Sequence, residues 1–227
     1  MYQPGYAVFI TVGSMKHFDR PVTPAEVSTD LHELISQLAP DSEVVYVEVV
    51  PLEGALIDHC FQLVDKYVEM HGGQVVVGWS LWELPTLFLE AEFHCVWRNP
   101  EGRLLDISPK KSVTAKILFL KDGLRIYDGR QVNNVRRVLH PDPMLLKYLE
   151  TFDTEFDLLN RGDLVGQHGE IHLLGSEANQ YHAIQSERAK LYLRLLGLFP
   201  KVGPYHPCPC GSGRKVKWCH KEFINAT

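Results

Sequence analysis

The chain has 227 residues, of which 45% are hydrophobic, and its formal net charge is −5 at pH 7. This length and composition are typical of one sizeable globular domain with an appendage. The longest apolar stretches fall far short of the roughly eighteen residues of a membrane-spanning helix, and no basic and apolar leader opens the chain. We therefore expect a protein of the reducing cytoplasm, with no part in a membrane.

From its start to residue 78, the chain is expected to alternate strands with helices. Residues 6–13 are rich in β-branched and aromatic side chains, which predicts a strand. Thr23-Pro24-Ala25-Glu26 is a capping box with proline at the first helical position, and it predicts a helix to about Leu38. Three elements follow: a strand over 43–50, a helix over 58–70 that ends at two glycines, and a short buried strand over 74–78.

The second half is expected to be built on a long hairpin. A strand over 87–98 leads into the turn Asn99-Pro100-Glu101-Gly102 and a return strand over 103–108. Two more strands (113–120 and 124–127) and two helices (142–162 and 176–198) complete the pattern. The sequence therefore predicts an α+β fold, an antiparallel sheet with packed helices.

The remaining residues divide into a linker and a tail. Residues 200–207 hold three prolines and a glycine and predict a linker between a body over 1–199 and a small knuckle over 208–221. Basic residues gather from Lys201 onward, whereas the body is acidic. An acidic body argues against a nucleic-acid groove, although the basic tail could touch an acidic protein or an RNA backbone.

Three of the five cysteines lie close together near the C-terminus. Cys208 and Cys210 form a C-x-C pair, and Cys219 and His220 follow after eight intervening residues. Thiolate sulfur with imidazole nitrogen is a usual tetrahedral donor set for zinc, and the intervening glycines allow a tight turn. A disulfide with a stray histidine is the alternative, but the even-numbered cysteine framework of secreted domains is missing.

The segment over 206–221 resembles the SEC-C motif, the short zinc knuckle also found at the C-terminus of the protein-translocation motor ATPase. The match includes Gly-Ser-Gly, the basic residues after it, and Trp218 before the last pair. The resemblance implies Cys208, Cys210, Cys219 and His220 as ligands of Zn²⁺. It also implies a protein-docking or ribosome-proximal role in some relatives.

A candidate nucleophilic site involves three residues of the body. Cys60 stands at the start of a helix if Asp58 caps that helix, and a helix N-terminus stabilises a thiolate. A bulged hairpin turn at 99–102 would place His94 and Asp106 on one face as diagonal neighbours, roughly 7 Å apart at the backbone. A carboxylate there could orient the imidazole. Cys95, on the opposite apolar face, is expected to be an inert core thiol.

The same residues resemble the transglutaminase-like cysteine fold. Cys60, then Phe93-His94-Cys95-Val96-Trp97, then an Asp106-Ile-Ser-Pro ending follow the order of that family. The resemblance implies a transglutaminase/papain-like body with Cys60 as nucleophile, His94 as general base and acid, and Asp106 as the orienting residue. The family's glycine before the nucleophile is missing, and the spacing from His94 to Trp97 is one residue longer.

Two functions therefore remain open. One is a cytoplasmic cysteine hydrolase or acyl-transferase that acts on an amide or acyl bond of an unknown substrate. The other is a non-catalytic zinc-binding adaptor that docks a protein partner through its knuckle.

Overall fold

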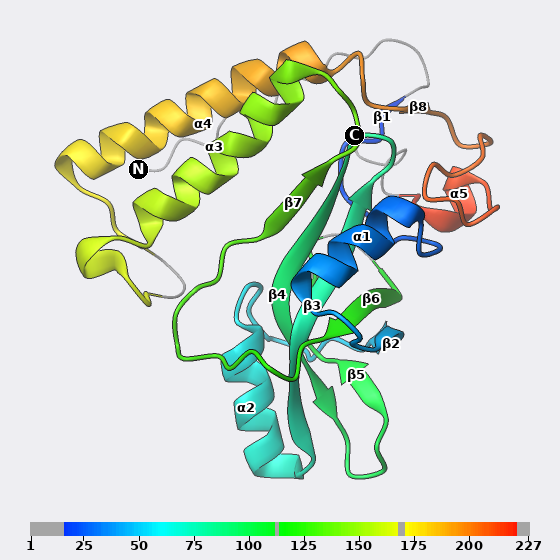
Figure 1. Ribbon diagram of the computed structural model, residues 1–227, viewed down its shortest axis with the longest axis vertical. Helices are drawn as coiled ribbons and strands as arrows, with labels where there is room; N and C mark the ends of the chain where they lie inside the picture. Colours follow the sequence, from blue (N-terminus) through cyan, green and yellow to red (C-terminus); the bar gives the residue numbers. More distant parts are fainter. Residues whose placement is uncertain (1–15, 112–113, 168–170, 222–227) are drawn as a thin grey trace.

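The computed structural model describes residues 16–111, 114–167 and 171–221 (Figure 1). The strand expected over residues 6–13 lies outside the described residues. The strands are β1 (Lys16–His17), β2 (Val44–Val49), β3 (Gln74–Leu84), β4 (Phe88–Arg98), β5 (Leu104–Asp106), β6 (Lys116–Lys121), β7 (Val135–Val138) and β8 (Lys201–Val202). The helices are α1 (Thr29–Leu38), α2 (Cys60–His71), α3 (Pro143–Leu159), a 3-10 turn (Gly162–Leu164), α4 (Gly175–Leu195) and the short α5 (Val216–Cys219).

The main sheet closes on itself. Its strands follow the order β3-β6-β2-β5-β4-β7, and β3 also pairs with β4, so five strands form a ring from which β7 extends. Every pair is antiparallel except β2 with β5. The predicted α+β class, with a largely antiparallel sheet, is confirmed.

The ring brings β3 and β6 unusually close at Gly78. A Cβ atom at this position would stand 2.1 Å from the Leu120 carbonyl oxygen and 2.7 Å from the Phe119 ring. Only glycine permits such an approach of two backbones. The interior of the ring is filled by a small apolar cluster centred on Val47, Val96, Ile117 and Phe119.

Two larger clusters lie outside the ring. One packs α1 and α2 against the sheet through Leu34 of α1, Phe61 and Val64 of α2, and Cys95 of β4. The other gathers the turn between β3 and β4, the helices α3 and α4, and the C-terminal knuckle. Within the described residues, no helix is both long and apolar enough to cross a bilayer.

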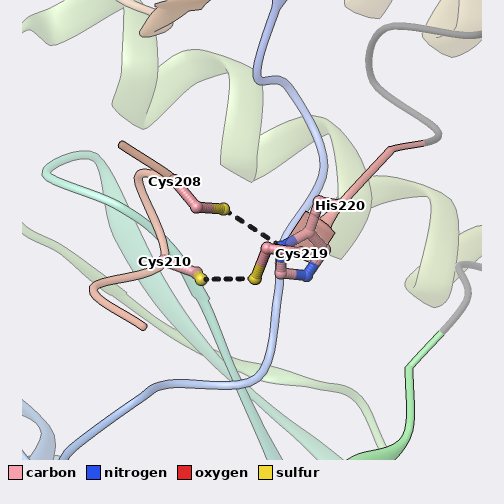
Figure 2. Close-up of side chains that lie close together, drawn as sticks. All are labelled: Cys208, Cys210, Cys219 and His220. Carbon is pink, nitrogen blue, oxygen red and sulfur yellow. Dashed lines mark hydrogen bonds between the residues drawn. The ribbon is translucent and has the colours of Figure 1, made fainter. Parts of the chain in front are cut away.

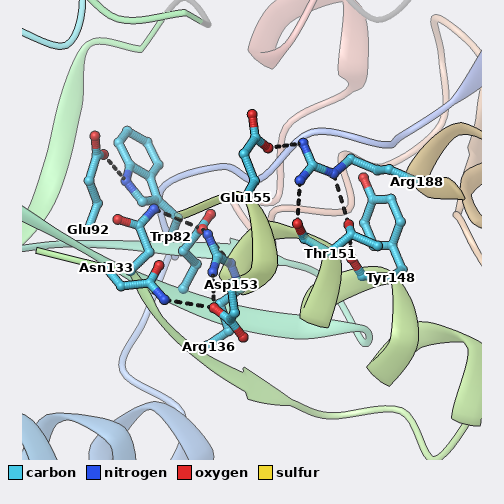
Figure 3. Close-up of polar contacts among 11 residues, drawn as sticks. Trp82, Glu92, Asn133, Arg136, Tyr148, Thr151, Asp153, Glu155 and Arg188 are labelled. Atoms are coloured by element: carbon cyan, nitrogen blue, oxygen red, sulfur yellow. Dashed lines mark hydrogen bonds and ion pairs between the residues drawn. The ribbon is translucent and has the colours of Figure 1, made fainter. Parts of the chain in front are cut away.

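The helices α3 and α4 pack against each other as a hairpin beside β7 (Figure 1). Half-buried charges join this hairpin to the sheet (Figure 3). Arg136 of β7 bonds Glu90 of β4 at 2.8 Å and Asp153 of α3 at 3.0 Å. Arg188 of α4 lies over the Phe152 ring, 3.9 Å from its centroid, and donates to the Thr151 carbonyl. The network cross-links β4, β7, α3 and α4, because each guanidinium has partners outside its own element.

The first helix begins later than its capping box predicts. Ser28 is the N-cap of α1, and its hydroxyl accepts from the Leu31 N–H at 3.3 Å. The predicted cap, Thr23, instead donates its hydroxyl to the Lys116 carbonyl 2.7 Å away. The Thr23 side chain, which the local pattern predicts to cap the helix, is thus bonded to β6 instead.

Two expectations for the sheet need correction, and one strand was not expected at all. The strand that starts at Gln74 does not stop at Gly78 but continues to Leu84, because it pairs along its whole length with β4. Residues 124–127 form no strand, since the Asp122 carboxylate accepts from the N–H groups of Leu124 and Arg125 and turns the chain out of the sheet. The strand β7, which the sequence analysis missed, pairs with β4 instead.

The segment expected as a linker contacts the body. Within it, β8 pairs with β1, and Val202 is buried in the same cluster as Phe199 and Phe18. The knuckle continues this packing, because Cys208, Cys210 and Val216 belong to that cluster. The division of the chain at residue 199 stays a prediction.

Candidate functional site

The structure brings the four predicted metal ligands together (Figure 2). The sulfur atoms of Cys208, Cys210 and Cys219 and a ring nitrogen of His220 all lie within 4.8 Å of one another. Cys208 Sγ is 3.2 Å from His220 Nδ1, and Cys210 Sγ is 3.6 Å from Cys219 Sγ. The two halves of the motif thus face each other across a space of atomic size.

The backbone explains how a strip this short forms such a cage. Gly211 and Gly213 have φ of 74° and 71°, a region that suits glycine, and they fold the chain back after the first pair. Cys208 N–H donates to the Arg214 carbonyl at 2.8 Å, which closes the turn. The single turn of α5 then presents Cys219, and His220 N–H donates to the Val216 carbonyl at 2.9 Å.

The spacing of the donors fits a tetrahedral zinc ion. With Zn–S bonds of about 2.3 Å and Zn–N bonds of about 2.0 Å, a tetrahedron separates two sulfurs by about 3.8 Å and sulfur from nitrogen by about 3.5 Å. The contacts of 3.6 Å and 3.2 Å lie close to these values. Three thiolates with one imidazole also form a closed structural set, because no coordination position remains for substrate.

Body residues support the ligand cage from outside. The Phe18 ring meets the His220 ring edge-on, with centroids 5.8 Å apart, and Phe18 is fully buried. Cys208 and Cys210 are buried in the cluster that includes Leu84 and Leu87 at the turn between β3 and β4. The candidate metal site is therefore fixed to the end of the long hairpin.

The second candidate site lies farther along the same hairpin. Asn99 N–H donates to the Arg103 carbonyl, and Trp97 pairs with Leu105, which is the register expected for the bulged turn. This register places His94 and Asp106 on one face, and Asp106 Oδ2 lies 3.1 Å from His94 Nε2. Both side chains are buried, with 2% and 0% of their residues' surface exposed.

Cys60 reaches this pair from α2, although not by the capping that the sequence predicts. His59 is the N-cap of α2 and makes no side-chain cap bond, while Asp58 has a φ of 65° and pairs with Lys111 at 2.9 Å. Asp58 therefore does not cap the helix. Cys60 is its first residue, so it stands at the helix N-terminus as expected, where free backbone amides favour a thiolate.

The pKa of Cys60 lies well below its ordinary value, at about 4. A hydrogen bond with the Cys95 thiol is the largest cause of this lowering, whereas burial acts in the opposite direction and raises the pKa. The charge of the His94 ring and a hydrogen bond with that ring lower the pKa of Cys60 further. Burial raises the pKa of Cys95, and so does its bond with Cys60. Cys95 is a buried core residue as expected, but it also contacts the candidate nucleophile.

The pKa of His94 is raised and that of Asp106 is lowered, so the two side chains form an ion pair. Burial lowers the pKa of His94, but the charge and hydrogen bond of Asp106, together with the charge of Cys60, outweigh burial and raise that pKa to about 10. Burial raises the pKa of Asp106, but His94 and Lys110 bring it down to about 2. Between about pH 4 and pH 10, Cys60 is therefore a thiolate and His94 an imidazolium, because each charge stabilises the other.

Lys110 is a member of this cluster that the sequence analysis missed. Its Nζ lies 2.7 Å from Asp106 Oδ2 and 3.1 Å from His94 Nε2. The only sequence signal is its position four residues after Asp106, and outside a helix that spacing predicts no contact.

Comparisons with known proteins support the metal site. The chain is 34% identical over 122 residues to a protein translocase subunit SecA of Ralstonia nicotianae, and 32% identical over 123 residues to that of Ralstonia pickettii. Each match covers 54% of this chain but 12% of the relative. No family model and no solved structure matches the chain. The similarity and the Cys3His cluster together support a SEC-C-like metal site, whereas the transglutaminase-like resemblance of the body stays a prediction.

Proposed function

We propose that this protein binds one structural zinc ion through Cys208, Cys210, Cys219 and His220, and that its body is a cysteine-dependent hydrolase or acyl-transferase with a transglutaminase/papain-like arrangement. The observation that carries the enzymatic proposal is the hydrogen bond of a low-pKa Cys60 thiol with His94, whose Nε2 is bonded to the buried Asp106 carboxylate. Such a base, oriented by a third group, marks an activated nucleophile.

Each residue has a defined role in the proposed reaction. The Cys60 thiolate attacks the carbonyl carbon of an amide or acyl bond, and His94 protonates the leaving group. Water, or an acceptor amine, then gives up a proton to His94 and releases the acyl group from sulfur. Asp106 holds the imidazole, and because it engages Nε2, Nδ1 is the nitrogen left to face the thiol. The Cys60 N–H at the helix start is a candidate oxyanion donor.

An acylation experiment tests the enzymatic proposal. The full-length protein is incubated at pH 6 with an activated thioester, and the acyl group is located by intact mass and peptide mapping. We expect transient acylation of Cys60 that is abolished in Cys60→Ser and strongly slowed in His94→Asn. Cys95→Ser replaces the neighbouring thiol with a hydroxyl that can still donate to the Cys60 sulfur, so it serves as the matched control and should still acylate at Cys60. Acylation that ignores His94 would contradict the assigned chemistry.

A second function rests on the surface of the knuckle. Trp218 and Tyr205 are exposed, and Lys217 Nζ lies 4.3 Å and 4.1 Å from their ring centroids. Exposed aromatic rings with lysines are suited to docking a protein partner. The matched relatives are named as protein translocase subunits, so a partner from protein translocation is the natural candidate. Absence of any Cys60 acylation, with partner capture that requires Trp218, would favour this adaptor role.

The cellular setting of both functions is proposed to be the cytoplasm. All five cysteines are free thiols, and three of them are suited to a metal rather than to a disulfide. A reducing compartment keeps such thiols available for zinc and for nucleophilic chemistry.

A further inference from the structure

Lys110 and His94 share one oxygen of a buried carboxylate. Asp106 Oδ2 lies 2.7 Å from Lys110 Nζ and 3.1 Å from His94 Nε2, and the Ser108 N–H occupies the other oxygen, Oδ1, at 3.0 Å. The Lys110 side chain is 12% exposed, although lysine usually keeps its ammonium in water. The burial of this ammonium at a histidine–aspartate pair is the feature to be explained.

The charges within the cluster show what the ammonium does. Asp106 balances one positive charge, but both Lys110 and a protonated His94 lie beside the same oxygen. Lys110 Nζ is also 3.1 Å from His94 Nε2, a distance at which two positive charges repel each other. Among the described residues, Cys60 of α2 also acts on the His94 ring through its charge, and Cys95 of β4 is hydrogen-bonded to Cys60. Only Lys110 among these groups opposes protonation of His94 by its charge.

We propose that Lys110 is a positioning residue of the candidate active site, whose ammonium anchors Asp106 and limits how tightly His94 holds its proton. The inference rests on the proposed function, in which His94 must both accept and release a proton. An imidazolium beside an unshared buried carboxylate would be a poor acid for the leaving group. With Lys110 present, part of the negative charge of Asp106 is already compensated, and the proton is easier to release.

Titration of His94 by NMR tests this role in the full-length protein. Correlations of the ring nitrogens report the protonation and tautomer of His94 as the pH is raised. In Lys110→Met, we expect His94 to lose its proton about one pH unit or more above the wild-type midpoint, because the opposing charge is gone. Lys110→Arg keeps the charge and should restore a midpoint near the wild-type value.

The next residue offers a matched control. Lys111 carries the same charge, but its side chain is 74% exposed and pairs with the exposed Asp58. Lys111→Met should leave the His94 midpoint unchanged. Equal midpoints in Lys110→Met and Lys111→Met would overturn the proposal.

A measurement on the wild-type protein covers the case in which Lys110→Met does not fold. The ¹⁵Nζ signal of Lys110 should change with the same midpoint as the His94 ring, because their nitrogens are in contact. A Lys110 signal that is indifferent to His94 would refute the coupling. Failure of the proposed enzymatic function is distinguishable: the titration would still show the coupling, while Cys60 would form no acyl adduct.

Discussion

The ionisation of Cys60 leads to a quantitative prediction of its reactivity. At pH 5, an ordinary thiol with a pKa of about 8.5 is about 0.03% thiolate, whereas a pKa of about 4 makes Cys60 roughly 90% thiolate. The gain in the reactive form is thus about 3,000-fold. A less basic thiolate is also a weaker nucleophile, and with a Brønsted coefficient of about 0.45 this costs roughly 100-fold. The net expectation is therefore a rate about 30-fold above that of an ordinary thiol.

The assay uses 2,2′-dipyridyl disulfide, whose thione product is followed by absorbance while peptide mapping assigns the labelled cysteine. The rate for Cys60 should stay nearly level from about pH 5 to pH 8, because the thiolate is already formed at the acidic end. Replacement of His94 by asparagine removes the neighbouring positive charge and should move the acidic limb of the profile upward by about one pH unit or more. The hydrogen bond between the Cys95 and Cys60 thiols remains in that variant, so its lowering of the Cys60 pKa is kept.

Cys95 supplies an internal comparison within the same protein. Its pKa is raised by burial, so it should be unreactive below neutral pH. A Cys60 rate that rises tenfold per pH unit between pH 5 and pH 8, as for an ordinary thiol, would refute the assignment of a thiolate. Labelling of both thiols at the same slow rate would refute it as well.

Two further predictions concern the metal and the charge network. Cys219→Ser should reduce the zinc content of protein purified without chelators from about one ion per chain to well below one. Elemental analysis checks this, with Cys95→Ser as the matched control. Full zinc occupancy without Cys219 would contradict the ligand set. Arg136→Met leaves the half-buried Glu90 without its guanidinium and should lower the free energy of unfolding in urea by about 3–5 kcal/mol. The exposed Arg130→Met should change it by no more than about 0.5 kcal/mol, and equal costs for the two arginines would show that the network adds nothing.

Local turn chemistry explains why the heart of the candidate active site could be predicted. Asn99-Pro100-Glu101-Gly102 determines the hairpin register, and Gly102 takes the φ of 88° that the bulged turn requires. Once the register is set, the position of Asp106 on the same face as His94, as its diagonal neighbour, follows by counting. The arrangement of the knuckle could be predicted for a similar reason, because four metal donors and two glycines within thirteen residues leave the segment few ways to fold.

Contacts between distant segments account for what could not be predicted. Thr23 satisfies a capping pattern, but its hydroxyl is taken by a carbonyl of β6, some ninety residues away in the chain. Lys110 joins the cluster of the candidate active site only because the chain after β5 turns back toward His94. The short strand β7 is recognisable only through its partner β4. In each case the deciding partner is remote in sequence, and local patterns carry no information about it.

The placement of the knuckle suggests why the metal matters to the body. Cys208 and Cys210 are buried among apolar side chains, and a thiolate in such surroundings is costly unless a cation compensates it. Zinc would supply that charge, and its binding would then stabilise packing against Phe18 and Val202 as well as the loop itself. Loss of the metal should consequently loosen the pairing of β8 with β1, not only the last turn of the chain. Hydrogen exchange at the paired amides of these strands tests this. Faster exchange after removal of the metal would show the coupling, and unchanged exchange would show that the knuckle folds independently of the body.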